Sequence, residues 1–214
     1  NGDQTIIKAA CGPNVTNMYK AYYNCINLTG SPVCGPNVTE MGQTYWYCYN
    51  LTGSPVCGDK VTDMYNTYYN CTNLTGSPVC GNNVTDMQCT YYNCSKLTGA
   101  PVCGDKVTTM YNTYYNCYRL TGVPVCGDKV TTMYNTYYYC TNLTGSPVCG
   151  NNVTNMNHAY YRCFNFSECI LCGNCYLACP QNIKTIRNDL DKAKAIIRRG
   201  GPVYASIAPS FVAN

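Results

Sequence analysis

Residues 57–80 read Cys57-Gly-Asp-Lys-Val-Thr-Asp-Met-Tyr-Asn-Thr-Tyr-Tyr-Asn-Cys-Thr-Asn-Leu-Thr-Gly-Ser-Pro-Val-Cys80, and close variants of this stretch fill most of the chain. The general unit is C-G-x-x-V-T-x-M-x-x-x-Y-Y-x-C-x-x-L-T-G-x-P-V, and seven copies run from residue 11 to 166 with a period of 23 residues. Such a period indicates a repeat architecture, because a unit this short cannot bury its own apolar side chains and must share a core with its neighbours.

Each unit is expected to form one coil of a solenoid. A segment such as Leu28 to Val33 would be a short parallel strand, and Met64 to Tyr69 would be a helical or 3₁₀ turn on the return side. Thr-Gly-Ser-Pro is turn chemistry, and Pro32 cannot donate to a strand ladder, so the strands should be short and imperfect. The positions expected to face the shared core in one unit are Leu28, Val33, Cys34, Val38, Met41, Tyr45 and Cys48.

Counted from Cys25-x-x-Leu28, the unit resembles the 23-residue leucine-rich repeats of BspA-like bacterial surface proteins. Their pattern is C-x-x-L-x-x-I-x-I-P-x-x-V-x-x-I-x-x-x-A-F, and it matches this chain over residues 11–166. Two positions depart from it, since Ser31 occupies an apolar position and Cys34 stands where the family has proline. The resemblance implies a right-handed solenoid whose usual role is interaction, with a protein or a glycan as the ligand.

Composition excludes several classes of function. The 214 residues include 19 Cys and 23 Tyr but only 11% charged side chains. The net charge of +4 is too small to indicate a nucleic-acid-binding surface. No stretch is long and apolar enough to span a membrane. His158 is the only histidine and lies in the last repeat, and no nucleophile–base set or phosphate loop is visible, so an electron carrier or binding protein is expected rather than an enzyme.

The repeated cysteines and tyrosines each allow two interpretations. The cysteines could be small buried hydrophobes, or neighbouring coils could be close enough for disulfides between them. One tyrosine of a pair such as Tyr68 and Tyr69 should face the core and stack on its neighbours, and the other would form an exposed aromatic stripe.

The composition changes after Phe166. Residues 167–187 contain Cys169-x-x-Cys172-x-x-Cys175-x-x-x-Cys179-Pro180, which is the cysteine run of bacterial ferredoxins. Closely spaced thiolates can hold several irons of one cubane. Structural zinc sites instead favour two separate pairs of ligands, each of the C-x₂-C type. The sequence therefore predicts a [4Fe–4S] cluster on Cys169, Cys172, Cys175 and Cys179.

The source of the fourth ligand is open. In two-cluster ferredoxins the last cysteine of a run completes the other cluster, and this chain has only one run. Cys179 could fold back on the same cluster, Cys163 could supply the fourth thiolate, or the partner motif could lie outside this sequence.

Residues 188–214 are expected to form a helix and a strand, making the C-terminal part a small α+β segment. Together with the cysteine run, Val203-Tyr-Ala-Ser-Ile-Ala-Pro-Ser-Phe211 resembles the junction in clostridial iron-only-hydrogenase-like proteins. The resemblance implies that residues 188–214 begin a truncated hydrogenase-like domain. The cysteines of a hydrogenase active site would lie beyond Asn214, so hydrogen chemistry is not expected of this chain.

Two functions follow from these observations. One is a redox module, in which a single cluster exchanges electrons with a partner protein that the sequence does not identify, in a reducing cytoplasm. The other is a BspA-like surface protein with no redox role. An anaerobic source would reconcile the two compartments. The change in composition without a linker after Cys163 also allows a fragment or a chimera of two reading frames, with residues 1–10 as a separate N-terminal segment.

Overall fold

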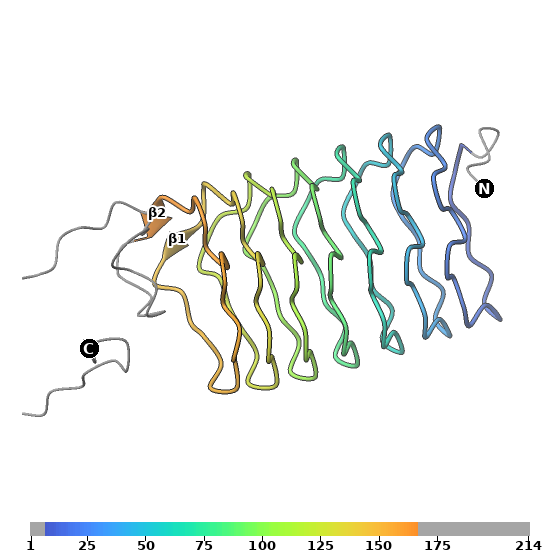
Figure 1. Cartoon of the computed structure of the whole chain (residues 1–214). Coiled ribbons are helices and arrows are strands. Elements are labelled where there is room, and N and C mark those ends of the chain that lie inside the picture. Colours follow the sequence, from blue (N-terminus) through green and yellow to red (C-terminus); the bar gives the residue numbers. More distant parts are fainter. Residues whose placement is uncertain (1–6, 167–214) are drawn as a thin grey trace, which may run out of the picture.

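The computed structural model describes residues 7–166, which form a stack of similar coils lying side by side (Figure 1). Each 23-residue unit makes one circuit, and isolated parallel bridges join the same position in successive coils. One continuous series of bridges runs through Asn17, Glu40, Asp63, Asp86, Thr109, Thr132 and Asn155. The chain therefore advances by one repeat per coil and keeps every side chain in register with its counterpart.

Extended strands are short. β1 (Thr144–Gly145) and β2 (Asn165–Phe166) are the only strands within residues 7–166, and they pair in parallel with Thr144 opposite Asn165. Both strands lie on the Leu-Thr-Gly side of their coil. In the other coils, the Leu-Thr-Gly segment makes a single backbone hydrogen bond to the preceding coil, such as that from the Thr75 N–H to the Gly53 carbonyl at 2.9 Å. The strand expected over Leu28–Val33 is thus reduced to a single pairing point, because Gly30 at φ 79° and the following proline end it.

The expected helical or 3₁₀ turn at Met64–Tyr69 is wrong. Residues 65–70 form consecutive β-turns, and no helix occurs within residues 7–166. Three N–H groups of this segment point to the next coil: Asn66 to the Gln88 carbonyl at 2.9 Å, Tyr68 to the Thr90 carbonyl at 2.9 Å and Asn70 to the Tyr92 carbonyl at 2.8 Å. Asn66 also has a φ of 54°, which interrupts a right-handed helix. Bonds between coils therefore replace the bonds that a helix would make within itself.

The core is a column of side chains contributed once per coil. Leu74, Val84 and Met87 are fully buried, and so are their counterparts in the neighbouring coils. The expectation that Val33 faces this core is wrong, since Val33 is half-buried and the preceding Pro32 is buried. A proline fits here because it has no N–H to leave unpaired inside the protein.

A buried threonine in each central coil was not expected from the sequence. Thr44, Thr67, Thr90, Thr113 and Thr136 have no exposed surface. The Thr90 hydroxyl lies 2.8 Å from the Met64 carbonyl in the preceding coil and 2.9 Å from the Met87 carbonyl in its own turn. The signal was available, because a short hydroxyl side chain stands at this position in five consecutive units.

Candidate functional site

The four predicted cluster ligands, Cys169, Cys172, Cys175 and Cys179, lie outside the described residues, as do the helix and strand expected over 188–214. Cys163 is described. It belongs to the inner cysteine ladder, a set of buried cysteines one coil apart: Cys25, Cys48, Cys71, Cys94, Cys117, Cys140 and Cys163. Within residues 7–166 no three His, Cys, Asp or Glu side chains are grouped closely enough to hold a metal ion.

Cys163 has the environment of a structural thiol. Its S–H donates to the Tyr137 carbonyl at 3.0 Å, as Cys140 donates to Tyr114 in the coil before it. Burial raises the pKa of Cys163 to about 12, so the thiolate that a cluster needs is disfavoured. Ligation by Cys163 would therefore require breaking this bond and withdrawing the side chain from the core.

The second series of cysteines forms the outer cysteine ladder, whose members are half-buried: Cys11, Cys34, Cys57, Cys80, Cys103, Cys126 and Cys149. Five of these sulfurs pack against the glycine of the next coil, namely those of Cys11, Cys34, Cys57, Cys80 and Cys103. A Cβ built on Gly81 would lie 2.9 Å from the Cys57 sulfur, closer than real contacts allow. No disulfide joins cysteines within residues 7–166, so this part of the chain uses its cysteines as packing groups and thiols.

Two columns of stacked aromatic rings run along the coils. The inner tyrosine row is buried in its central coils and consists of Tyr22, Tyr45, Tyr68, Tyr91, Tyr114, Tyr137 and Tyr160. The outer aromatic row is half-exposed and consists of Tyr23, Trp46, Tyr69, Tyr92, Tyr115, Tyr138 and Tyr161. The expectation that one ring of each pair faces the core is confirmed, and it is the first ring.

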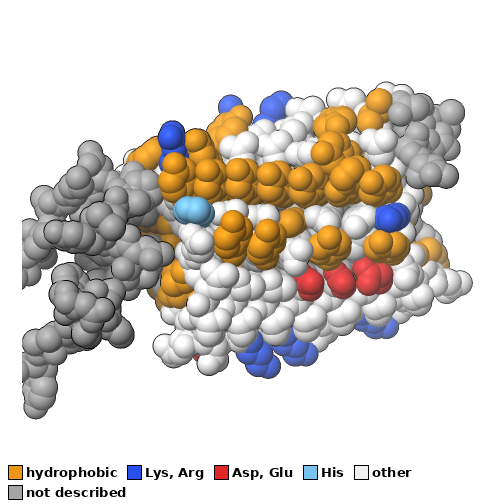
Figure 2. Space-filling model, viewed as in Figure 1, with side chains coloured by type: hydrophobic (Ala, Val, Ile, Leu, Met, Phe, Trp, Pro, Cys, Tyr) orange, Lys and Arg blue, Asp and Glu red, His pale blue; other side chains and the backbone are white. Residues whose placement is uncertain are grey.

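The outer aromatic row crosses one face of the stack as a continuous apolar line (Figure 2). Its rings are stacked face to face, with centroids 4.5 Å apart for Tyr69 and Tyr92 and 4.6 Å apart for Tyr92 and Tyr115. The rings therefore present edges rather than faces to a ligand, which disfavours a glycan that stacks on open aromatic faces.

Three acidic side chains lie in line on the same face, separated from this row by a second, interrupted line of apolar side chains (Figure 2). Glu40, Asp63 and Asp86 each accept a hydrogen bond from a backbone N–H two residues ahead, for example Gln88 N–H to Asp86 at 2.7 Å. Burial raises the pKa of Asp86, and the neighbouring Asp63 raises it further. Asn17 and Asn155 make the same bond in other coils, so the acidic groups serve as local turn caps.

His158 takes no part in any such constellation. Its side chain is exposed, and its ring meets Tyr138 and Tyr161 edge-on. Arg162 lies over the rings of Tyr139 and Tyr161, 4.9 Å and 5.6 Å from their centroids. These contacts extend the aromatic surface at one end of the stack. Among residues 7–166 no helix is long and apolar enough to cross a bilayer.

Comparison with protein families matches residues 163–185 to a 4Fe–4S binding domain. This match covers the whole predicted cysteine run, and the chain therefore has a [4Fe–4S] cluster as its cofactor. Comparison with curated proteins and with solved structures finds no match. The relation of the repeats to BspA-like leucine-rich repeats, and that of residues 188–214 to hydrogenase-like proteins, stay predictions.

The register of the repeat continues into the matched segment. Cys172 follows Cys149 by 23 residues, and it precedes Gly173 just as Cys149 precedes Gly150. The family match itself begins at Cys163, inside the last repeat. The second cysteine of the run is thus in phase with the outer cysteine ladder, whereas the first, Cys169, is not.

Proposed function

From the 4Fe–4S binding domain at residues 163–185, we propose that this chain is a one-electron carrier, with the repeat stack as the body that contacts its partners. The observation that carries the proposal is the family match over the C-x₂-C-x₂-C-x₃-C-P run. A cubane held by thiolates supplies reversible one-electron chemistry. The protein's part is to hold the irons, exclude water and set the approach of the partner.

The proposed ligands are Cys169, Cys172, Cys175 and Cys179. The donor set fits the cluster, since it consists of four thiols within eleven residues and holds no competing imidazole. The environment of Cys163 favours Cys179 as the fourth ligand, because Cys163 already donates its proton to a buried carbonyl. A cluster of this kind fits a reducing compartment, in which the thiols of residues 7–166 would also persist.

The repeat stack is proposed to bind a protein rather than a sugar. Its outer aromatic row offers a line of ring edges and hydroxyls across seven coils, flanked by the exposed rings of Tyr19 and Tyr111. Tyrosine at a surface combines a large apolar area with a hydrogen-bonding group, which is typical of protein interfaces. The alternative function, a BspA-like interaction protein with no redox role, uses the same surface.

One measurement separates the two functions. The full chain is reconstituted anaerobically with iron and sulfide, and iron and acid-labile sulfide are counted per chain alongside electron paramagnetic resonance of the reduced sample. About four irons and four sulfides with a reduced-cluster signal support the electron carrier. A chain that forms no stable cluster would leave the repeat stack as the functional part.

Matched variants test the ligands. Cys172→Ser is expected to abolish the cluster and to leave unfolding of the repeats unchanged. Cys163→Ser and Cys140→Ser occupy equivalent buried positions and should behave alike, with the cluster retained. Loss of the cluster in Cys163→Ser alone would show that Cys163 is a ligand.

A further inference from the structure

The last two complete coils bring four sulfur atoms together. The Cys149 S–H points at two thioethers, with its sulfur 3.4 Å from the Met156 sulfur and 3.9 Å from the Met133 sulfur. Cys126, its neighbour in the outer cysteine ladder, lies near enough for the Cys149 side chain to lower the pKa of the Cys126 thiol. Two thiols and two thioethers from adjacent coils therefore converge on one place.

This arrangement differs from the interior of the ladder. Cys57 and Cys80 donate their S–H groups to the carbonyls of their own following glycines, Gly58 and Gly81, at 3.7 Å and 3.6 Å. Neither of these two sulfurs hydrogen-bonds a methionine sulfur, although each coil has the same Cys and Met positions. Cys126 makes the same kind of glycine bond, to the Gly127 carbonyl at 3.6 Å, and at the other end of the stack the Cys11 sulfur lies 3.6 Å from the Met18 sulfur. What distinguishes Cys149 is that a second thioether, Met133 of the preceding coil, also lies against its sulfur.

The environment of Cys126 favours its thiolate. The Cys149 side chain, together with the Gly150 backbone, lowers the pKa of Cys126 to about 7, against the opposing effects of burial and of the nearby Asp128 carboxylate. In contrast, burial raises the pKa of Cys103, one coil away, to about 12. A thiolate that receives backbone N–H groups is well suited to bind a metal, because the same bonds persist when the sulfur is ligated.

This group of four sulfur atoms is partly accessible to solvent on one side only. Met133 is fully buried, whereas Cys126, Cys149 and Met156 are half-buried. A small ion can therefore reach the sulfurs from the surface, while the buried thioether closes the inner side.

We propose that Cys126, Cys149, Met133 and Met156 form a binding site for a soft monovalent cation of the Cu(I) or Ag(I) class. Thiolate and thioether ligands select soft ions, and the set contains no imidazole or carboxylate that would favour harder ones. Binding displaces the thiol protons to solvent, and the metal keeps its oxidation state. The site uses none of the proposed cluster ligands, Cys169, Cys172, Cys175 and Cys179.

The test is an anaerobic Cu(I) titration of the full chain, read against a chromophoric Cu(I) chelator that competes for the metal. The cysteines of residues 167–214 are present in every variant. A difference between variants in the amount of bound Cu(I) therefore comes from the outer cysteine ladder. Cys126→Ser/Cys149→Ser is expected to remove one equivalent of the tightest-bound Cu(I). The matched control Cys57→Ser/Cys80→Ser is expected to keep that equivalent.

Methionine variants separate binding from folding. Met133→Leu/Met156→Leu conserves side-chain volume and leaves every thiol in place, and it should weaken the tightest Cu(I) site at least tenfold. Met64→Leu/Met87→Leu is the control and should change nothing. Equal losses in the test and control variants, no loss in either, or a Cys126–Cys149 disulfide in the anaerobically purified chain would overturn the proposal.

Discussion

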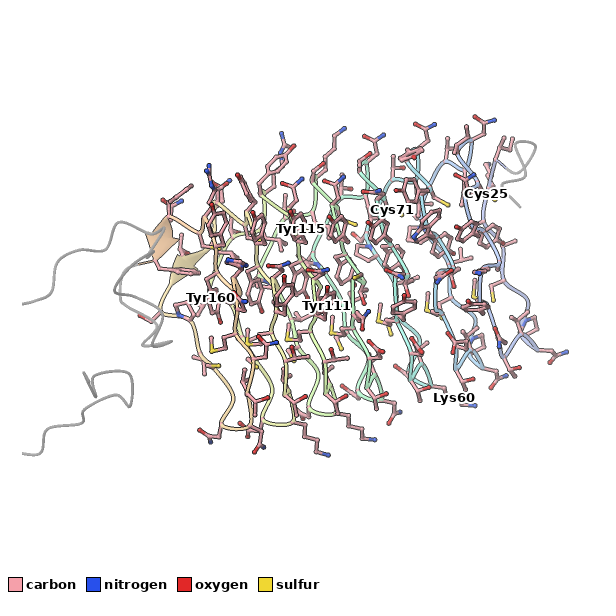
Figure 3. All side chains as sticks on the ribbon, in the orientation of Figure 1. Cys25, Lys60, Cys71, Tyr111, Tyr115 and Tyr160 are labelled. Atoms are coloured by element: carbon pink, nitrogen blue, oxygen red, sulfur yellow. The ribbon has the colours of Figure 1, made fainter. Side chains whose placement is uncertain are left out.

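The Tyr91 hydroxyl closes a two-way hydrogen bond with the backbone of Val79, twelve residues earlier in the chain. It donates to the Val79 carbonyl at 2.7 Å and accepts from the Val79 N–H at 3.0 Å. The Tyr68 hydroxyl does the same with Val56, and the Tyr114 hydroxyl with Val102. Each of these coils is thus closed across its own interior by a tyrosine hydroxyl, which supplies the bonds that a neighbouring strand would supply in a sheet. Figure 3 shows the side chains of successive coils repeating in register along the stack.

Tyr91→Phe should lower the free energy of unfolding by about 1–3 kcal/mol. The ring still stacks on Tyr68 and Tyr114, whose centroids lie 5.6 Å and 5.5 Å away, but the Val79 N–H and carbonyl lose their partner inside the protein. Urea denaturation followed by circular dichroism measures the change. Tyr92→Phe in the half-exposed outer row is the control and should cost less than half as much, and an equal cost would contradict the bond's importance.

Gly81→Ala should destabilise the stack because the new methyl group meets the Cys57 sulfur at 2.9 Å and the Gly58 carbonyl oxygen at 3.2 Å. Overpacking of this kind typically costs about 1–3 kcal/mol. Adding Cys57→Ala removes the sulfur and should restore part of the loss. Strictly additive effects in the double variant, measured by thermal unfolding, would show that the two coils do not touch at this point.

Asn93 has a φ of 58°, and its side-chain amide donates to Asn70 at 2.8 Å. Asn93→Ala and Asn93→Gly both remove the amide, and only glycine adopts this backbone conformation without strain. The alanine variant should therefore unfold at lower urea, with a free energy of unfolding lower by about 1–2 kcal/mol than that of the glycine variant. Equal stability of the two variants would argue against the left-handed turn.

Alkaline pH should unfold the repeats cooperatively. Burial raises the pKa of Tyr68, Tyr91 and Tyr114 well above 10, and it raises the pKa of Cys48 to about 12. The unfolded chain releases these protons near the ordinary values, so above about pH 9–10 it binds fewer protons than the folded chain. Stability is therefore complete below that range and falls as pH rises, by about 1.4 kcal/mol per pH unit for each such group.

Ultraviolet titration of the tyrosines measures this effect. The half-exposed outer row should ionise first, and the inner row only together with the loss of the circular dichroism signal. Gradual ionisation of every tyrosine while the repeats stay folded would contradict the burial of the inner row.

Much of the core was readable from the repeat. Leu28, Val38, Met41 and Tyr45 recur at fixed positions, and all of them are buried. Val33 was misplaced because a pattern of apolar letters does not show that its backbone is bonded by the Tyr45 hydroxyl, which turns the preceding proline inward instead. The turn at Met64–Tyr69 was mistaken for a helix because its amides alternate between partners in the same coil and in the next one.

The sequence by itself determined the period, the in-register columns of cysteine and tyrosine, and the cysteine run that matches a 4Fe–4S binding domain, because these depend on spacing along the chain. Tertiary structure alone decided which cysteines differ from one another. Cys163 and Cys149 both sit at fixed repeat positions, yet one donates to a buried carbonyl and the other faces two methionine sulfurs. The reason is physical: a thiol's protonation and partners depend on burial and on atoms from adjacent coils, and neither is encoded by spacing within one repeat.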